Sequence, residues 1–352
     1  MTTAILAIDQ GTTNSKAVLV STAGEILSRG SSPVGIEHPQ PGWVEQSPLR
    51  IWASVQEAIA ACLAQVPTVQ ILGIAISNQR ESVTIWDADD GQPLGPVVSW
   101  QCRRSAPACA ELIAAGHEPR VRALTGLPID PMFPGPKMKW LLDRAPAGHR
   151  VRLGTIDAWL IHCLTDGQVH ACDAANAARS QLLDLNRMEW SDELCALFGI
   201  PKAALPELRD SAARFGETRG VAGLPDGIPI CAAIGDSHAA LFGHRAFHSG
   251  DGKVTFGTGS SIMMALQGFI APQQGITTTI NGETVLSTGI NGFGIRIQDA
   301  SSHAPVALAG NNWLPFNVNS RPGFEAVPVK QSGTQLTASE FSATMTMVVE
   351  YQ

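Results

Sequence analysis

This chain opens, at residues 4–20, with the run Ala4-Ile5-Leu6-Ala7-Ile8-Asp9-Gln10-Gly11-Thr12-Thr13-Asn14-Ser15-Lys16-Ala17-Val18-Leu19-Val20. An apolar strand ends on an acid, and a hydroxyl-rich glycine turn leads into a second strand. Glycine lets a backbone approach a phosphate closely, and the turn N–H groups with the Thr and Ser hydroxyls can donate hydrogen bonds to it. Asp9 stands where a carboxylate can hold Mg²⁺ beside that phosphate. The alternative interpretation is an ordinary β-hairpin with a Gly-Thr turn.

A second hairpin of the same kind lies at residues 253–264, where Gly257-Thr258-Gly259 separates two apolar segments. Two such phosphate turns in one chain indicate a duplicated ATPase core. Between them, Ile228–Ile234 has the pattern of a buried strand, and Gly235-Asp236 leads from it into the helix-like segment Ala239–Gly243. An acid at such a strand-to-helix junction faces a crevice and not the core.

Composition limits the class of protein. With 352 residues and 44% apolar content, the chain can bury a full core and is expected to form about two domains. The net charge of −7 and the absence of a basic run argue against nucleic acid and against an anionic membrane surface, so a small molecule is the expected partner. The seven cysteines are odd in number and contain no CxxC pair, which argues against disulfides and a zinc site. Without a leader or a long apolar run, we expect a soluble cytoplasmic protein.

Periodicity predicts an α/β organisation. Residues 4–8, 16–20 and 25–28 are expected to form an antiparallel meander, and residues 69–77 a central buried strand. Ser47-Pro48 begins a helix with apolar residues at helical spacing. Further helices are expected near residues 105–115, 136–144, 155–164 and 191–197. Residues 244–252 are the expected hinge between a first domain, 1–243, and a second, 253–352, and no element is assigned beyond about residue 280.

A charged pair follows the central strand in Asn78-Gln79-Arg80-Glu81. An arginine that donates and a glutamate that accepts hydrogen bonds suit a polyhydroxyl ligand held over the edge of a sheet. The alternative for such a pair is a solvated salt bridge of little energetic value.

With these segments the chain resembles the FGGY carbohydrate kinase family, and within it the glycerol-kinase-like members. The resemblance covers roughly residues 4–280 and is carried by these segments: Asp9–Lys16, His38–Glu45, Asn78–Glu81, Trp100–Arg104, Thr125–Pro131, Gly154–Leu160 and Gly257–Gly259. It implies two ribonuclease-H-like, actin-like domains that close on ATP, Mg²⁺ and a sugar or polyol. A homo-oligomer is compatible with it.

The resemblance also implies a role for each matched residue. Asp236 matches the acid that takes the proton from the attacking hydroxyl, and Asp9 matches the acid that positions Mg²⁺. Three further groups follow: Thr12, Thr13 and Lys16 at the first phosphate loop, Gly257, Thr258 and Gly259 at the second, and Arg80, Glu81 and Trp100 in the substrate pocket. Lys16 stands where glycerol kinases usually carry Arg, which keeps one positive charge but loses bidentate geometry.

Two departures bear on the acceptor. Met132 stands where glycerol kinases carry a Tyr whose hydroxyl helps bind glycerol, and Ser261 stands where a Phe walls the small glycerol pocket. Replacing an aromatic ring by Ser opens volume and adds a donor. Both residues therefore favour a polyol or sugar larger than glycerol.

A third departure concerns residues 281–352, which match nothing in the second half of the family's C-terminal domain. We therefore expect a complete first domain and an incomplete second one, the tail being the product of a truncation or a frameshift. The function that follows is ATP-dependent phosphorylation of a polyol or sugar hydroxyl. The alternatives are an inactive remnant that binds a sugar or acts as a regulator, and an actin- or chaperone-like ATPase without a small acceptor.

Overall fold

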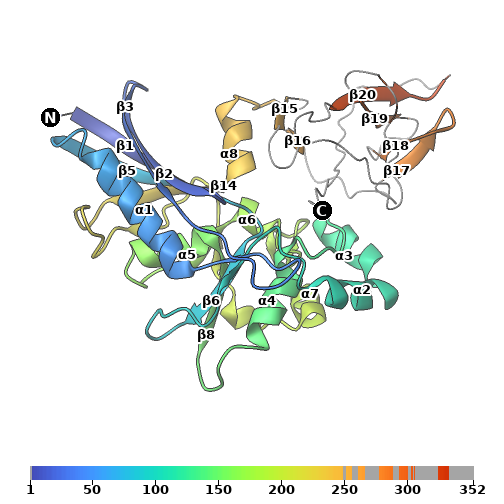
Figure 1. The fold of residues 1–352 in the computed structure, drawn as a ribbon, viewed down its shortest axis with the longest axis horizontal. Coiled ribbons are helices and arrows are strands. Elements are labelled where there is room, and N and C mark those ends of the chain that lie inside the picture. The colour runs from blue at the N-terminus through green and yellow to red at the C-terminus, as the bar shows by residue number, and fades with distance from the viewer. Residues whose placement is uncertain are drawn as a thin grey trace. The chain divides into compact units, whose positions relative to one another are not determined.

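The computed structural model of the chain describes residues 2–248, 251–255, 261–265, 277–287, 293–299, 303, 305 and 324–332. The chain divides into two compact units, Met1–Ala239 and Ala240–Gln352; the first is coloured from blue to yellow in Figure 1, and the described part of the second from orange-yellow to red. The domain boundaries expected from the sequence, at residues 243 and 253, stay a prediction.

The first unit is built on a six-stranded sheet with the strand order β13-β14-β5-β1-β2-β3. Its strands are β1 (Thr2–Gln10), β2 (Asn14–Ser21), β3 (Ile26–Pro33), β5 (Val69–Asn78), β13 (Gly216–Glu217) and β14 (Pro229–Gly235). The antiparallel meander β1-β2-β3 and the central strand β5 confirm the sequence prediction. Because β1, β5 and β14 are mutually parallel, their carboxyl ends lie at one edge of the sheet.

Helix α1 (Pro48–Leu63) covers β2 and β3 of this sheet. Ser47 caps it, since its side chain accepts a hydrogen bond from Arg50 N over 3.3 Å. The helix backbone lies so close to β3 that a Cβ at Gly30 would stand 2.0 Å from the Ala58 carbonyl oxygen. Only glycine permits this approach, which brings the apolar face of the helix into the core.

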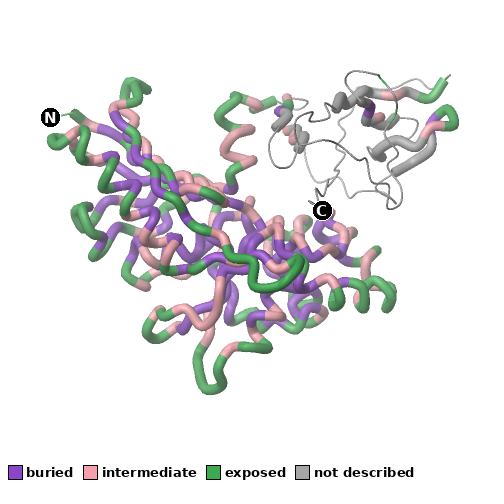
Figure 2. The backbone as a smooth tube through the Cα atoms, viewed as in Figure 1, coloured by how far each residue is buried: buried purple, intermediate pink, exposed green. Residues whose placement is uncertain are grey.

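The first unit also contains a second sheet of four strands, ordered β4-β7-β6-β8. Its strands are β4 (Glu45–Gln46), β6 (Val83–Asp87), β7 (Val97–Val98) and β8 (Val151–Thr155). Helix α5 (Ile156–Leu164) is almost wholly buried and contacts strands of both sheets. Figure 2 shows buried positions concentrated along the strands and inner helices of the unit, with exposed positions in the outer loops.

The first unit also contains further helices and short strands. They are α2 (Ala106–Ala114), α3 (Glu118–Thr125), α4 (Pro134–Leu142), α6 (Ala174–Ala177), α7 (Asp192–Phe198), the 3₁₀ helix η1 (Lys202–Ala204), β9 (Ala171–Asp173), β10 (Leu183–Asp184), β11 (Glu189–Trp190) and β12 (Glu207–Arg209); α8 (Asp236–Gly243) spans the division between the units. The four expected helices occur as α2, α4, α5 and α7. Sequence reasoning does not predict helix α3, half of whose residues are charged or polar.

The second unit contains a hairpin and a small sheet in its described part. Strands β15 (Gly252–Thr255) and β16 (Ser261–Met264) pair antiparallel, as the sequence predicts. A sheet follows, with β17 (Thr277–Ile280), β18 (Glu283–Ser287), β19 (Phe293–Asp299) and β20 (Phe324–Lys330) in that order. Sequence reasoning assigns no element beyond residue 280, and the structure places β18, β19 and β20 there. Asn281-Gly282, a strong hairpin signal with positive φ at both residues, joins β17 to β18.

Candidate active site

Two acids lie at the carboxyl edge of the central sheet, one on each side of β5. Asp9 is near the end of β1 and pairs in register with Ser77 of β5, which pairs on its other side with Ile234 of β14. Asp236 follows β14 by one residue. Ser77 Oγ donates to Asp9 Oδ1 over 3.3 Å. The parallel strands thus bring together acids that are more than two hundred residues apart in the sequence, at the edge where such sheets bind ligands.

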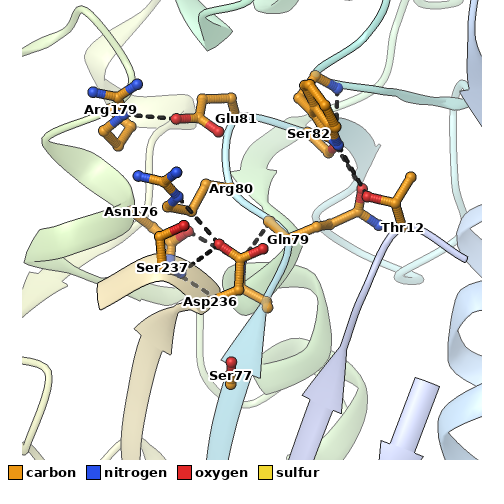
Figure 3. A network of polar contacts seen from close by, with 12 residues as sticks. Thr12, Ser77, Gln79, Arg80, Glu81, Ser82, Asn176, Arg179, Asp236 and Ser237 are labelled. Atoms are coloured by element: carbon orange, nitrogen blue, oxygen red, sulfur yellow. Dashed lines mark hydrogen bonds and ion pairs between the residues drawn. The ribbon is translucent and has the colours of Figure 1, made fainter. Parts of the chain in front are cut away.

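Asp236 forms an ion pair with Arg80, as Figure 3 shows. Arg80 Nε donates to Asp236 Oδ1 over 3.2 Å, and Ser237 N donates to the same oxygen over 2.6 Å. The arginine crosses Gly235 so closely that a Cβ there would lie 2.6 Å from Arg80 Cγ. The ion pair therefore requires glycine at the end of β14, because any side chain there would collide with Arg80.

Desolvation raises the pKa of Asp236 above its ordinary value, while the charge of Arg80 opposes the rise. The negative charges of Glu81 and Asp9 raise the pKa further. The side chain of Asp236 still exposes 46% of its surface, so a small molecule can reach the carboxylate. A raised pKa and an open face are the properties that a general base requires.

Glu81 is buried in a left-handed backbone conformation, with φ at 61°. Its carboxylate accepts a hydrogen bond from Arg179 Nε over 2.6 Å (Figure 3). Burial raises the pKa of Glu81, but the charges of Arg179 and Arg80 outweigh burial and leave the pKa below its ordinary value. The residue is therefore a charged acceptor held in a strained and defined position.

Lys137 lies beneath this segment and is fully buried. Its Nζ donates to the Glu81 carbonyl oxygen over 2.6 Å and to the Ser99 carbonyl oxygen over 3.2 Å. Burial lowers the pKa of Lys137 to about 7, although the negative charge of Glu81 opposes this. The ammonium group ties the Arg80-Glu81 segment to the segment that precedes Trp100.

Trp100 connects the expected acceptor pocket with the phosphate turn. Its Nε1 donates to Thr12 Oγ1 over 2.9 Å, and its backbone N donates to Ser82 Oγ over 3.0 Å. Met132 is half-buried, and its backbone N donates to Asp130 Oδ1 over 2.8 Å. The ring of the next residue, Phe133, lies 5.0 Å from the guanidinium carbon of Arg179.

The phosphate turn, residues 11–14, is closed by a hydrogen bond from Gly11 N to Asn14 O over 3.0 Å. Thr12 is half-buried, whereas Thr13 and Lys16 are exposed. Lys16 stands opposite Asp9 on the neighbouring strand, with Nζ 3.6 Å from Asp9 Oδ2. An exposed hydroxyl residue, Thr13, and an exposed cation that pairs with an acid therefore stand at the turn.

The structure brings seven of the sequence-predicted residues into one connected site on the first unit: Asp9, Thr12, Lys16, Arg80, Glu81, Trp100 and Asp236. Thr13 lies in the same turn as Thr12, and Met132 lies in the turn that precedes α4. Gly257, Thr258 and Gly259 lie outside the described residues, and so does the side chain of Ser261, whose backbone belongs to β16.

Sequence reasoning missed Arg179 and Lys137. Their partners lie far away in the sequence, and the local pattern is weak: Asp173, Asn176 and Arg179 recur every three residues across α6 and the residues that flank it. Asn176 connects this segment to the central sheet, because its side-chain amide exchanges two hydrogen bonds with that of Asn78 at the end of β5.

Other kinds of site are not seen in the described part of the chain. There, no group of three or more His, Cys, Asp or Glu residues stands together as a metal site would require. Within the same residues, no helix has the length and apolar content to cross a membrane. The seven cysteines are free thiols.

Comparison with known proteins agrees with this geometry. Residues 4–243 match the family model of the N-terminal domain of the FGGY family of carbohydrate kinases. The chain belongs to the FGGY family. The matched residues contain the whole edge of the sheet described above.

Two curated FGGY relatives are similar over most of this chain. The apulose kinase of Pectobacterium atrosepticum is 42% identical over 79% of this chain and 58% of its own length. The glycerol kinase of Symbiobacterium thermophilum is 43% identical over 78% of this chain and 57% of its own length. The chain thus spans a little over half the length of these curated relatives.

A solved FGGY structure, the glycerol kinase of Plasmodium falciparum with ADP, superposes with a TM-score of 0.71 at 26% identity. The superposed region includes 94% of this chain and 61% of the Plasmodium falciparum chain. Structures of this family confirm the expected actin-like, ribonuclease-H-like fold.

Proposed function

We propose that this chain phosphorylates a hydroxyl group of a polyol or sugar with ATP as the phosphoryl donor. The observation that carries the proposal is the Arg80-Asp236 ion pair at the carboxyl edge of the sheet, beside the buried carboxylate of Glu81. Together these groups offer a donor, an acceptor and a base to a polyhydroxyl compound. The family of the chain supports the same chemistry.

In this proposal Asp236 is the general base. It takes the proton from the acceptor hydroxyl as that oxygen attacks the γ-phosphorus, and ADP leaves with the electrons of the broken bond. Arg80 donates to a neighbouring hydroxyl of the acceptor, and Glu81 accepts from another. Trp100 supplies an apolar wall for the carbon chain.

The phosphate turn is the proposed site of the ATP phosphates. Thr12 and Thr13 donate hydroxyl hydrogen bonds, and Lys16 offsets the negative charge that develops on the transferred group. Gly257, Thr258 and Gly259 are the proposed second turn. Asp9, a partly exposed carboxylate beside the hydroxyl of Ser77, has the oxygen ligands that Mg²⁺ prefers and is the proposed holder of that ion. The ion would supply charge neutralisation of the ATP phosphates.

The proposed acceptor is larger than glycerol. Met132 offers no hydroxyl where glycerol kinases carry Tyr, and Ser261 occupies the place of a Phe. The similarity to an apulose kinase and to a glycerol kinase is nearly equal, at 42% and 43%, so sequence identity does not choose between them. The pocket residues favour the longer substrate.

A coupled assay of ADP release with three- to six-carbon polyols, ketoses and aldoses tests the proposal. We expect acceptor-dependent release with a preference for four or more carbons. Preference for glycerol would refute the size argument. Acceptor binding without ADP release would replace the kinase by a sugar-binding function, and ADP release without any acceptor would point to an ATPase.

A further inference from the structure

A closed ring of five hydrogen bonds joins the Trp100 side of the site to the phosphate turn. Trp100 Nε1 donates to Thr12 Oγ1 over 2.9 Å, and Trp100 N donates to Ser82 Oγ over 3.0 Å. Ser82 Oγ donates in turn to Gln79 Oε1 over 2.8 Å. The ring is closed by Gln79 Nε2, which donates to Gln46 Oε1 over 2.9 Å, and by Gln46 Nε2, which donates to the Thr12 carbonyl oxygen over 2.8 Å.

The two amides of this ring are buried and fully engaged. Gln79 and Gln46 expose 1% and 2% of their surface. The second hydrogen of Gln79 Nε2 goes to Gln10 Oε1 over 3.0 Å, and that of Gln46 Nε2 goes to the Gly35 carbonyl oxygen over 3.2 Å. Because a buried amide without its partners is costly, neither can turn alone. A displacement of the phosphate turn therefore requires a displacement of the residues around Gln79 and Trp100, and the reverse also holds.

The ring also fixes the direction of the Thr12 hydroxyl. Its oxygen accepts the indole hydrogen of Trp100, so its own hydrogen points away from the indole. A phosphate oxygen only accepts hydrogen bonds, and Thr12 is thereby prepared as a donor. Trp100 belongs to the proposed acceptor pocket and also contacts Thr12, the residue proposed to bind the phosphate.

We propose that Gln46 is a positioning residue that couples the two subsites, so that a bound acceptor strengthens nucleotide binding and a bound nucleotide strengthens acceptor binding. This inference rests on the proposed function. Gln46 lies on β4, outside the segments proposed to touch either ligand. Its amide holds the phosphate turn through Thr12 and the Arg80-Glu81 segment through Gln79. Coupling between two binding sites is reciprocal, and a shared rigid element is enough to carry it.

The test compares Gln46→Met, which keeps the length of the side chain but removes its donors and its acceptor, with the wild-type chain. Calorimetry gives the dissociation constant of the preferred acceptor with and without a non-hydrolysable ATP analogue and Mg²⁺. The ratio compared is the dissociation constant without the nucleotide analogue divided by the constant with it. We expect this ratio to exceed one in the wild type and to fall about fivefold in the variant, within the usual range of coupling. Each ligand alone should bind with similar affinity in both proteins.

Gln181→Met is the matched control, because Gln181 is also fully buried but donates to the Pro128 carbonyl oxygen, outside the ring. An unchanged ratio in Gln46→Met, an equal fall in Gln181→Met, or a wild-type ratio of one would each overturn the inference. If Gln46→Met does not fold, Gln46→Glu replaces it. That variant keeps the acceptor for Gln79 and loses the donors to Thr12 and Gly35.

A measurement without ligands separates this inference from the proposed function. Hydrogen exchange of peptides that cover residues 11–14 and 79–82 should rise in both segments for Gln46→Met and in neither for Gln181→Met. A rise in one segment only, or in none, overturns the coupling whatever the chain binds. A joint rise in a chain that binds neither polyol, sugar nor nucleotide supports the mechanical link and refutes the proposed function.

Discussion

The Nζ atom of Lys137 lies 2.6 Å from the carbonyl oxygen of Glu81, a residue whose backbone stands in the left-handed region. A non-glycine residue pays about 1–3 kcal/mol for such a conformation and keeps it only where the surroundings hold it. The buried ammonium group of Lys137 is such a holder, since it also binds the Ser99 carbonyl oxygen before Trp100. The proposed acceptor groups thus depend on a side chain that touches no substrate.

Lys137→Met should raise the acceptor KM about tenfold and change kcat less, because it releases Glu81 without touching Asp236. Steady-state kinetics with the preferred acceptor measures both constants. Lys139→Met on the same helix, where the lysine is half-buried and pairs with Asp143, is the control and should leave KM and kcat unchanged. Equal KM values in the two variants would show that Lys137 has no positioning role.

Lys137 should also give the protein a pH-dependent stability above neutrality. Its pKa is about 7 when folded, against about 10.4 in an unfolded chain, so between these values the unfolded chain binds one more proton. The free energy of unfolding should therefore rise as pH increases from about 7 to about 10. Urea titrations of wild type and Lys137→Met across this range measure it. The same slope in both proteins would assign the rise to other groups.

Asp236→Asn should lower kcat by about two decades or more with little change in acceptor affinity. The amide keeps the shape of the side chain and still accepts a hydrogen bond from Arg80, but it no longer takes a proton. The coupled assay gives kcat, and calorimetry gives acceptor affinity. Near-normal turnover would remove Asp236 from the role of base.

Met132→Tyr should shift acceptor preference toward glycerol by about 1–2 kcal/mol, a typical value for one pocket contact. The new hydroxyl restores the group that glycerol kinases carry there, and the ring fills volume next to Phe133. Relative kcat/KM for glycerol and for a five-carbon polyol measures the shift. Ser261→Phe should act in the same direction. No shift in either variant would contradict the pocket argument.

Asp157→Asn should stabilise the protein at neutral pH. Burial, with the charge of Asp173, raises the pKa of Asp157 to about 7, against about 3.9 unfolded. Between these values the folded chain holds a proton that the unfolded chain has lost, so wild-type stability falls as pH rises from about 4 to about 7. Asn stays neutral, and the Thr155 hydroxyl can turn to accept from its amide. Urea unfolding at pH 5 and 7.5 should show a smaller fall in the free energy of unfolding for Asp157→Asn than for the wild type. Asp166→Asn, at an exposed position, should behave as wild type.

The chemistry at the ends of the strands could be predicted because it is local. Apolar runs predict β1, β5 and β14, and the parallel order of these strands then places Asp9 and Asp236 at one edge. The turn Gly11–Asn14 carries its hydroxyls within four residues. Sequence reasoning missed the strands after residue 280, although apolar residues alternate along β19 and Asn281-Gly282 is a hairpin signal.

The sequence by itself determined which residue types stand at the ends of these strands, because hydrophobic period and turn chemistry act between neighbours in the chain. Only the tertiary structure decided what surrounds Glu81. Lys137 and Arg179 reach it from 56 and 98 residues away, and Gln46 reaches Thr12 from 34 residues away. Such contacts leave no local pattern, because buried polar groups are satisfied by whichever side chain the packing of helices and sheets brings into reach.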